Sequence, residues 1–210
     1  MKPRHDGAFP PWPAGRNLAD IQWMAWMPGV LLAALALARP WLESHMARHM
    51  GLELPLLFMV GWLAARLAGP RLTRALDPWN AHGLSALVFG ALAMAFWMVP
   101  AALDMAVLNP LMGTIKVGAW LLAGLLLGAS WNRSGLVVQA FFLFNGCWMT
   151  IAVGLVYQQA SSQLCSVYLP DEQWSAGAAM VFWAVAVFTL WLPGAVRASN
   201  LLGDGPARRG

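Results

Sequence analysis

About six apolar stretches, each close to 20 residues long, follow one another along the chain with only short segments between them. A helix of about 20 apolar residues is long enough to cross the hydrocarbon core of a bilayer. Because lipid offers no hydrogen-bond partners, the backbone of such a segment has to be helical or part of a closed barrel. We therefore expect an all-α, polytopic membrane helix bundle of about six transmembrane helices, at roughly residues 21–38, 44–67, 84–103, 112–131, 135–157 and 175–196.

Composition agrees with a chain embedded in lipid. Hydrophobic residues make up 60% of the sequence and charged residues only 10%, whereas soluble domains carry about 25% charged residues. This excludes an ordinary soluble enzyme, a disordered protein and a secreted disulfide scaffold. We expect a tail at residues 1–20, one transmembrane domain at 21–197 and a second tail at 198–210.

The first apolar stretch has an alternative interpretation as a cleaved signal peptide. Ala34, Ala36 and Ala38 offer a small-residue cleavage pattern. Against cleavage, about 20 residues precede the stretch, which is long for such a signal, and the stretch itself carries Trp23 and Trp26. The later spans would keep their orientation in either case.

The distribution of Lys and Arg predicts the orientation in the membrane. Ten of the 13 Lys and Arg residues lie in or next to the two tails and the connections after the second and fourth spans. Only Arg39, Arg48 and Lys116 lie near the opposite ends of the spans. Because cytoplasmic segments carry the excess of Lys and Arg, both termini should be cytoplasmic. We expect a multi-pass protein of the cytoplasmic (inner) membrane, with the connections after the first, third and fifth spans facing the periplasm. The net charge of +4 reflects this orientation, and we expect no nucleic-acid partner.

Potential metal ligands concentrate at the predicted outer ends of the spans. His45 and His49 are four residues apart, which places both rings on one face of a helix, and Met46 and Met50 repeat that spacing on the adjoining face. Thioether and imidazole groups suit a soft ion such as Cu(I). The motif lacks the glutamate of a zinc protease. We predict His45 and His49 as copper ligands.

Further ligands are predicted on the neighbouring spans. Met94, Met98 and Met105 follow one helical stripe, so Met98 and Met105 are candidate additional ligands, although such a stripe is also typical of core packing. Asp104 and Lys116 are expected to form a salt bridge or to be solvated. The candidate transfer or secondary ligands are Met46, Met50, Met112 and Cys165, and the candidate groups for orienting ligands by hydrogen bonds are Asp104, Glu172 and Gln173.

Three stretches of the chain resemble the CtaG family of cytochrome c oxidase assembly factors. They are the His45-Met46-x-x-His49-Met50 run with Pro55 downstream, the segment from Phe96 to Asp104, and Glu172-Gln173 followed by Gly177 and Met180. The resemblance extends from about Pro40 to Trp191. The chain departs from the family pattern in carrying Met98 where a His is expected, and in having about six spans instead of seven.

The resemblance implies a copper-handling assembly factor, and the predicted outer ligands independently favour a soft-metal site at the outer face. Such a protein receives Cu(I) at the outer face and passes it to a cytochrome oxidase subunit or a periplasmic copper carrier, without acting as an enzyme. The main alternative is a non-catalytic accessory subunit of a larger respiratory membrane complex. Two further alternatives rank below it. One is a haem b or quinone site, where haem would need axial ligands on opposing helices. The other is a copper permease.

Overall fold

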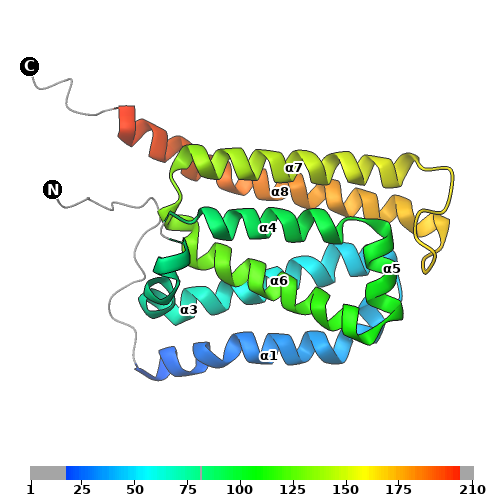
Figure 1. Cartoon of the computed structure of the whole chain (residues 1–210), viewed down its shortest axis with the longest axis horizontal. Coiled ribbons are helices and arrows are strands. Elements are labelled where there is room, and N and C mark those ends of the chain that lie inside the picture. Colours follow the sequence, from blue (N-terminus) through cyan, green and yellow to red (C-terminus); the bar gives the residue numbers. More distant parts are fainter. Residues whose placement is uncertain (1–17, 81, 204–210) are drawn as a thin grey trace, which may run out of the picture.

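The structure is a bundle of long helices. The computed structural model describes residues 18–80 and 82–203, in which every regular element is helical (Figure 1). The elements are α1 (Leu18–Leu42), α2 (Met46–Arg48), the π-helix η1 (His49–Glu53), α3 (Leu54–Asn80), α4 (Leu84–Trp97), α5 (Pro100–Leu108), α6 (Pro110–Ser130), the 3₁₀-helix η2 (Trp131–Arg133), α7 (Leu136–Gln159) and α8 (Pro170–Gly203).

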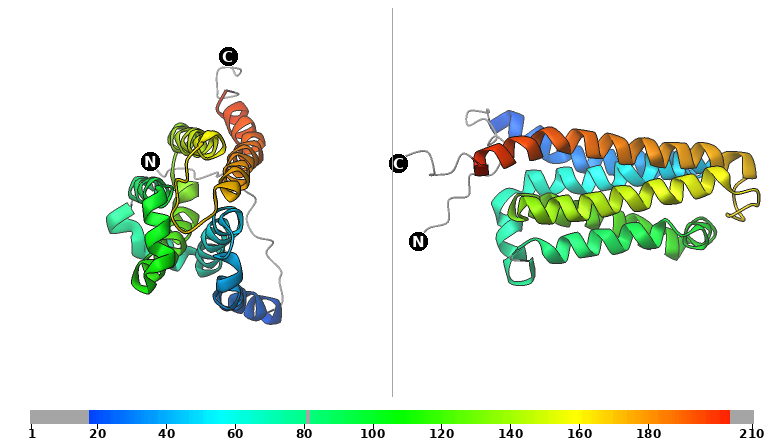
Figure 2. Two further views of the ribbon diagram at one scale, coloured as in Figure 1. Left: turned by 90° about the vertical axis from the view of Figure 1, so that its right-hand side faces the viewer. Right: turned by 90° about the horizontal axis from the view of Figure 1, so that it is seen from above.

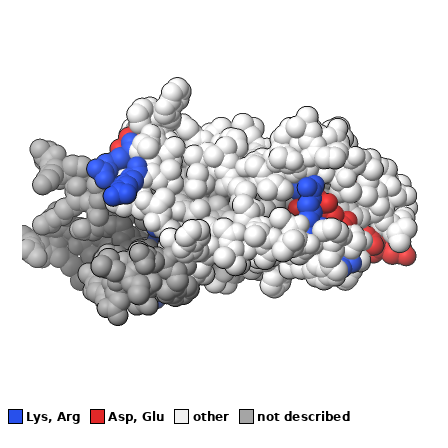
Figure 3. All heavy atoms as spheres, turned by 90° about the horizontal axis from the view of Figure 1, so that it is seen from below, with Lys and Arg blue, Asp and Glu red and all other residues white. Residues whose placement is uncertain are grey.

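Within the described residues, five helices are long and apolar enough to cross a membrane, or there are six spans if the bent pair α4 and α5 counts as one. The predicted all-α membrane bundle is therefore confirmed. On the face drawn in Figure 3, charged side chains lie toward the two ends of the bundle, with an uncharged band between them. This is the distribution expected of a chain whose middle lies in hydrocarbon.

The long helices lie side by side, and the bundle has two distinct ends. The start of α1 and the end of α8 lie at the same end of the bundle, on its opposite margins (Figure 1). At the other end lie α2, η1, α5 and the connecting segment 160–169, and we call this the α5 end. Seen along the bundle in Figure 2, α1 occupies one margin and the α7–α8 pair lies away from it, with α3 and α6 between.

The predicted tails lie mostly outside the described residues. Residues 1–17 and 204–210 are not described, and the remaining parts of both predicted tails are helical. The first helix begins at Leu18 rather than at residue 21, and α8 continues to Gly203. The continuation of α8 is understandable because no proline interrupts the sequence between Pro193 and Pro206.

The predicted third span, residues 84–103, is not one straight helix. Helix α4 ends at Trp97, and α5 begins at Pro100 with a bend of 80° between the two. Proline lacks a backbone N–H and pushes the preceding residue out of helical geometry. Val99 is accordingly extended, with φ −74° and ψ 125°. The 14 residues of α4 extend over about 21 Å, which is less than the hydrocarbon thickness of about 30 Å.

The predicted second span, residues 44–67, begins with irregular helix. The N–H of Leu54 bonds to the carbonyl of His49, the five-residue spacing of a π-helix. Pro55 has no N–H to offer the carbonyl of Gly51, as an α-helix would require. That carbonyl instead accepts a hydrogen bond of 2.6 Å from Trp183 Nε1 on α8. At its far end the span breaks at Gly69, where φ is +60° and Pro70 follows.

Glycine lets the two most extensive helix pairs approach closely. A Cβ on Gly124 of α6 would lie 2.0 Å from the carbonyl oxygen of Phe58 on α3. On the other pair, a Cβ on Gly177 of α8 would lie 2.3 Å from the carbonyl oxygen of Gly154 on α7. Small residues at such contacts are typical of helix packing in membranes, where backbone proximity replaces the hydrophobic drive of water.

We expect Gly124→Ala to destabilise the bundle, because its Cβ meets backbone that cannot move aside without shifting α3. Overpacking of this kind costs about 1–3 kcal/mol. Thermal unfolding in detergent would measure the loss. Gly118→Ala on the same helix is the control, since nothing lies within 4 Å of the added Cβ, and it should unfold at or above the parent's temperature. Equal effects of the two changes would contradict the close approach of α3 and α6.

Candidate functional site

The α5 end contains a buried lysine whose charged group is held by three acceptors. Lys116, in the second turn of α6, is fully buried. Its Nζ lies 2.8 Å from Glu43 Oε1, 2.8 Å from Glu53 Oε1 and 3.0 Å from His49 Nε2. An ammonium group has three donors, so this arrangement satisfies all of them. We call Lys116, Glu43, His49 and Glu53 the Lys116 cage.

A second cation balances the charge of the cage. Arg39 lies in the last turn of α1, and its Nε donates to Glu43 Oε1 at 2.9 Å. Two carboxylates therefore face one guanidinium and one ammonium group, and their formal charges cancel. Burying charges in a low-dielectric region is unfavourable unless they are paired and hydrogen-bonded. Neutral pairing explains how this group of side chains can be accommodated at the end of a membrane bundle.

His49 connects the cage to the segment 160–169. Its Nδ1 lies 2.5 Å from the hydroxyl oxygen of Tyr168, and the two rings meet edge to face. Because Lys116 offers only donors, His49 Nε2 is the acceptor, which places the ring proton on Nδ1 and makes His49 the donor to Tyr168. Burial, followed by the nearby negative charge of Glu43 and Glu53, raises the pKa of the Tyr168 hydroxyl, so that it stays protonated.

One carboxylate oxygen of the cage lacks a hydrogen bond. Glu53 Oε2 is buried and has no hydrogen-bond partner within the described residues. It lies 3.6 Å from His49 Nε2, too far for a hydrogen bond. Glu43, His49 and Glu53 each offer one ligand atom, and these three atoms lie within 4.8 Å of one another. These three side chains could hold a metal ion, but the ammonium group of Lys116 occupies the space between them.

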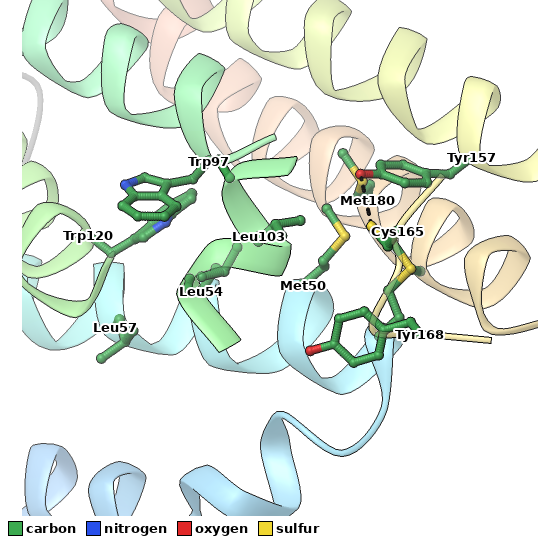
Figure 4. Close-up of a cluster of buried hydrophobic side chains, with 14 residues drawn as sticks. Met50, Leu54, Leu57, Trp97, Leu103, Trp120, Tyr157, Cys165, Tyr168 and Met180 are labelled. Carbon is green, nitrogen blue, oxygen red and sulfur yellow. Dashed lines mark hydrogen bonds between the residues drawn. The ribbon is translucent and has the colours of Figure 1, made fainter. Parts of the chain in front are cut away.

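Four sulfur-bearing side chains are buried beside the cage. Met46 belongs to α2, Met50 to η1, Cys165 to the segment 160–169 and Met180 to α8, and all four belong to the buried core. Figure 4 shows Met50, Cys165 and Met180 next to one another. The Cys165 sulfur is 4.0 Å from the Tyr157 hydroxyl oxygen. We call these four residues the sulfur cluster.

The segment 160–169 is held in place by two side chains that the sequence had suggested as orienting groups. Asp104 Oδ2 on α5 accepts from the backbone N–H of Ser166 at 2.7 Å and from its hydroxyl at 2.8 Å. Buried Gln173 on α8 accepts from the N–H of Leu164 at 2.5 Å. These bonds fix the backbone on both sides of Cys165. Burial and the charge of Asp104 raise the pKa of the Cys165 thiol to about 11.

Glu172, the third suggested orienting residue, contacts the start of α2. Its Oε2 accepts from the N–H of Met46 at 3.1 Å, and its Oε1 lies 3.7 Å from His45 Nε2. Lys116, by contrast, makes its ion pairs with Glu43 and Glu53 and not with Asp104. The predicted alternatives of an Asp104–Lys116 salt bridge or a solvated Lys116 are therefore both wrong.

His45 and His49 do not share a helix face as predicted. His45 caps α2 with extended backbone, φ −150° and ψ 131°, and its Nδ1 accepts from the N–H of Ala47. The side chain of His45 is 35% exposed, while that of His49 is fully buried. Because the helix begins only after His45, the i, i+4 relation no longer aligns the two rings. Both ring nitrogens of His49 also have protein partners.

The predicted methionine stripe is likewise divided. Met94 lies on α4 and Met98 is its C-cap, whereas Met105 lies on α5 beyond the 80° bend. Met105 is 47% exposed. Met98 and Met112 are partly buried and pack against the core that contains the sulfur cluster. The bend at Pro100 is the physical reason, since the stripe requires one continuous helix.

Sequence reasoning gave no site role to Lys116, Glu43, Glu53, Tyr168 or Met180. The available signal was the set of charged residues inside predicted spans. A lysine within an apolar stretch needs a buried partner, and the chain has only nine carboxylates. Pairing Lys116 with the nearest carboxylate in sequence missed Glu43, in the turn after α1, and Glu53, on η1, which lie 73 and 63 positions away.

Comparison of the chain with protein-family models, with curated proteins and with solved structures finds no match. The resemblance to the CtaG family therefore stays a prediction from the three sequence stretches.

We expect Lys116→Met to lower the free energy of unfolding by about 3–5 kcal/mol, because it leaves partly buried Glu43 and buried Glu53 with one cation fewer. Arg48→Met removes a cation at the same end, where the guanidinium lies over the Trp41 ring at 4.5 Å. That change should cost only about 1 kcal/mol. Chemical unfolding in detergent would compare them. A loss for Lys116→Met no greater than that for Arg48→Met would argue against the cage.

We expect the Cys165 thiol to react slowly in the folded protein. With its pKa raised from 9.0 to about 11, the thiolate at pH 8 is about 100-fold scarcer than that of an ordinary thiol. A Cys147→Ser variant leaves Cys165 as the only thiol for maleimide labelling. Its rate at pH 8 should be at least about 100-fold lower than after unfolding in dodecyl sulfate. Similar rates in the two states would show that Cys165 is accessible.

Proposed function

We propose that this chain is a membrane copper-handling protein that binds Cu(I) in the sulfur cluster at the α5 end and passes it to a partner. The observation that carries the proposal is that Met46, Met50, Cys165 and Met180, from α2, η1, the segment 160–169 and α8, all belong to one buried core, in which Met50, Cys165 and Met180 lie next to one another (Figure 4). Two of these residues, Met46 and Met50, stand close together in sequence, but Cys165 and Met180 reach the same place only through the fold.

The chemistry of the group favours a soft monovalent ion. Thioether and thiol sulfur suit Cu(I), whereas carboxylate and carbonyl oxygen suit Mg²⁺, Ca²⁺ and Mn²⁺. The three methionines are neutral at any pH, so they bring no charge into the apolar surroundings. Cys165 carries its proton at neutral pH because its pKa is about 11, and binding as a thiolate would release that proton.

A route to the cluster is supported by three further methionines. Met105 is exposed on α5, and Met98 and Met112 are partly buried against the same core. His45 is partly exposed and directly precedes Met46. These residues would form weak, exchangeable contacts for an ion moving between the surface and the cluster. His49 has no part in this route, since its ring is committed to the Lys116 cage.

The predicted orientation places the α5 end in the periplasm. Copper would then be received from the outer compartment and delivered there. By the resemblance described above, the recipient is a cytochrome oxidase subunit or a periplasmic copper carrier. The proposed step is an exchange of ligands, which makes or breaks no covalent bond in a substrate, so we propose a non-enzymatic role.

Anaerobic loading of the purified chain with Cu(I), followed by measurement of bound copper, tests the proposal. We expect about one copper ion per chain, lost in a Cys165→Ala/Met180→Leu variant. The matched control is Met98→Leu/Met105→Leu, which should retain copper with slower exchange. Copper lost from the control but kept in the cluster variant would move the site to α4 and α5. No copper in the parent chain would favour the accessory-subunit alternative instead.

A further inference from the structure

We propose that Glu43, His49 and Glu53 have the ligands of a zinc-type divalent-cation site. The ammonium group of Lys116 occupies the position of the ion and so prevents metal binding. Lys116 would thereby exclude Zn²⁺ and similar divalent ions from the α5 end. The inference goes beyond the copper proposal and does not depend on it, because it concerns different side chains and a different ion.

The donor set is that of a zinc site. Zinc is held in proteins by imidazole nitrogen and carboxylate oxygen at about 2.0–2.2 Å. Two ligands of a tetrahedral ion at those bond lengths lie about 3.4 Å apart. His49 Nε2 and Glu53 Oε2 are 3.6 Å apart, and the ligand atoms of all three side chains fall within 4.8 Å of one another. Only small side-chain adjustments separate this arrangement from a metal-binding one.

The unpartnered oxygen of Glu53 is an independent sign of a cation site. Glu53 is 3% exposed, and its Oε2 faces the imidazole with no donor to satisfy it within the described residues. A buried acceptor without a partner is costly. The other oxygen already accepts from Lys116 at 2.8 Å. A metal ion placed between Glu53 Oε2 and His49 Nε2 would satisfy the free oxygen, and a lysine alone does not.

Lys116 occupies the centre that such an ion would need. Its ammonium contacts one atom from each of the three side chains at 2.8–3.0 Å. With Arg39 also bound to Glu43, the group is already neutral, so an added divalent ion would meet two fixed positive charges. Replacing Lys116 by a neutral side chain leaves two carboxylates and an imidazole without the cation that they share. Lys116 is thus the residue that determines whether the site accepts a metal.

This arrangement would make the α5 end selective. Zinc is bound through imidazole nitrogen and carboxylate oxygen as well as through thiolate sulfur, and an open cage beside the sulfur cluster would capture it. The Lys116 ammonium group is covalently attached to α6, so it cannot diffuse out of the cage as a bound metal ion could. A divalent ion at low concentration would therefore not replace it. The buried lysine therefore excludes divalent ions without itself adding a metal site.

Zinc titration of the full-length chain in detergent micelles, in competition with a chromophoric zinc indicator, tests the inference. We expect Lys116→Met to bind one Zn²⁺ per chain at least about 10-fold more tightly than the parent. Lys116→Arg keeps the charge and should resemble the parent. Adding Glu53→Gln to Lys116→Met should abolish the gain. Zinc binding by Lys116→Met no tighter than that of the parent, or a gain that survives Glu53→Gln, would overturn the proposal.

A second variant and a second measurement guard against loss of folding. Lys116→Gln removes the charge but retains a donor for the carboxylates, and it should show the same gain in zinc affinity. Zinc should also raise the unfolding temperature of Lys116→Met and leave that of Lys116→Arg unchanged. Equal shifts in the two variants would contradict the inference. Because Met180→Leu should alter copper loading and not these zinc results, failure of one proposal is distinguishable from failure of the other.

Discussion

Burial of the Lys116 ammonium group is the constraint on which the α5 end depends. A charge in this position requires acceptors for all of its donors, and no single helix supplies them. Glu43 follows α1, His49 and Glu53 lie on η1, and Lys116 is on α6. The cage therefore fixes three separate elements relative to one another, and Tyr168 extends the same network to a fourth.

Irregular backbone makes this arrangement possible. Pro55 frees the carbonyl of Gly51, which then accepts a hydrogen bond from Trp183 on α8. The π-helix η1, which ends two residues before Pro55, carries both His49 and Glu53. Pro100 turns α5 across the end of the bundle, where Asp104 reaches the backbone around Ser166. Each departure from regular helix leaves polar groups that a neighbouring element takes up, as lipid surroundings require.

Two kinds of chemistry lie next to each other at this end. The cage is charged, balanced and fully committed to internal partners, apart from one oxygen of Glu53. The sulfur cluster is neutral and polarizable, with a thiol kept protonated by burial. The rotation between successive residues of η1 places them side by side, since Met50 follows His49 directly and belongs to the core drawn in Figure 4. A soft ion and a hard or borderline ion would thus meet different surroundings within one small region.

The sequence alone determined the fold class and the approximate spans, because lipid permits few backbone arrangements and about 20 apolar residues identify each crossing. It also indicated that the important polar and sulfur residues gather at one end. The tertiary structure decided which of them meet. Whether His45 and His49 shared a face depended on where the helix began, and the partners of Lys116 depended on which helices pack together. Neither follows from local spacing, because long-range pairing is set by packing between helices.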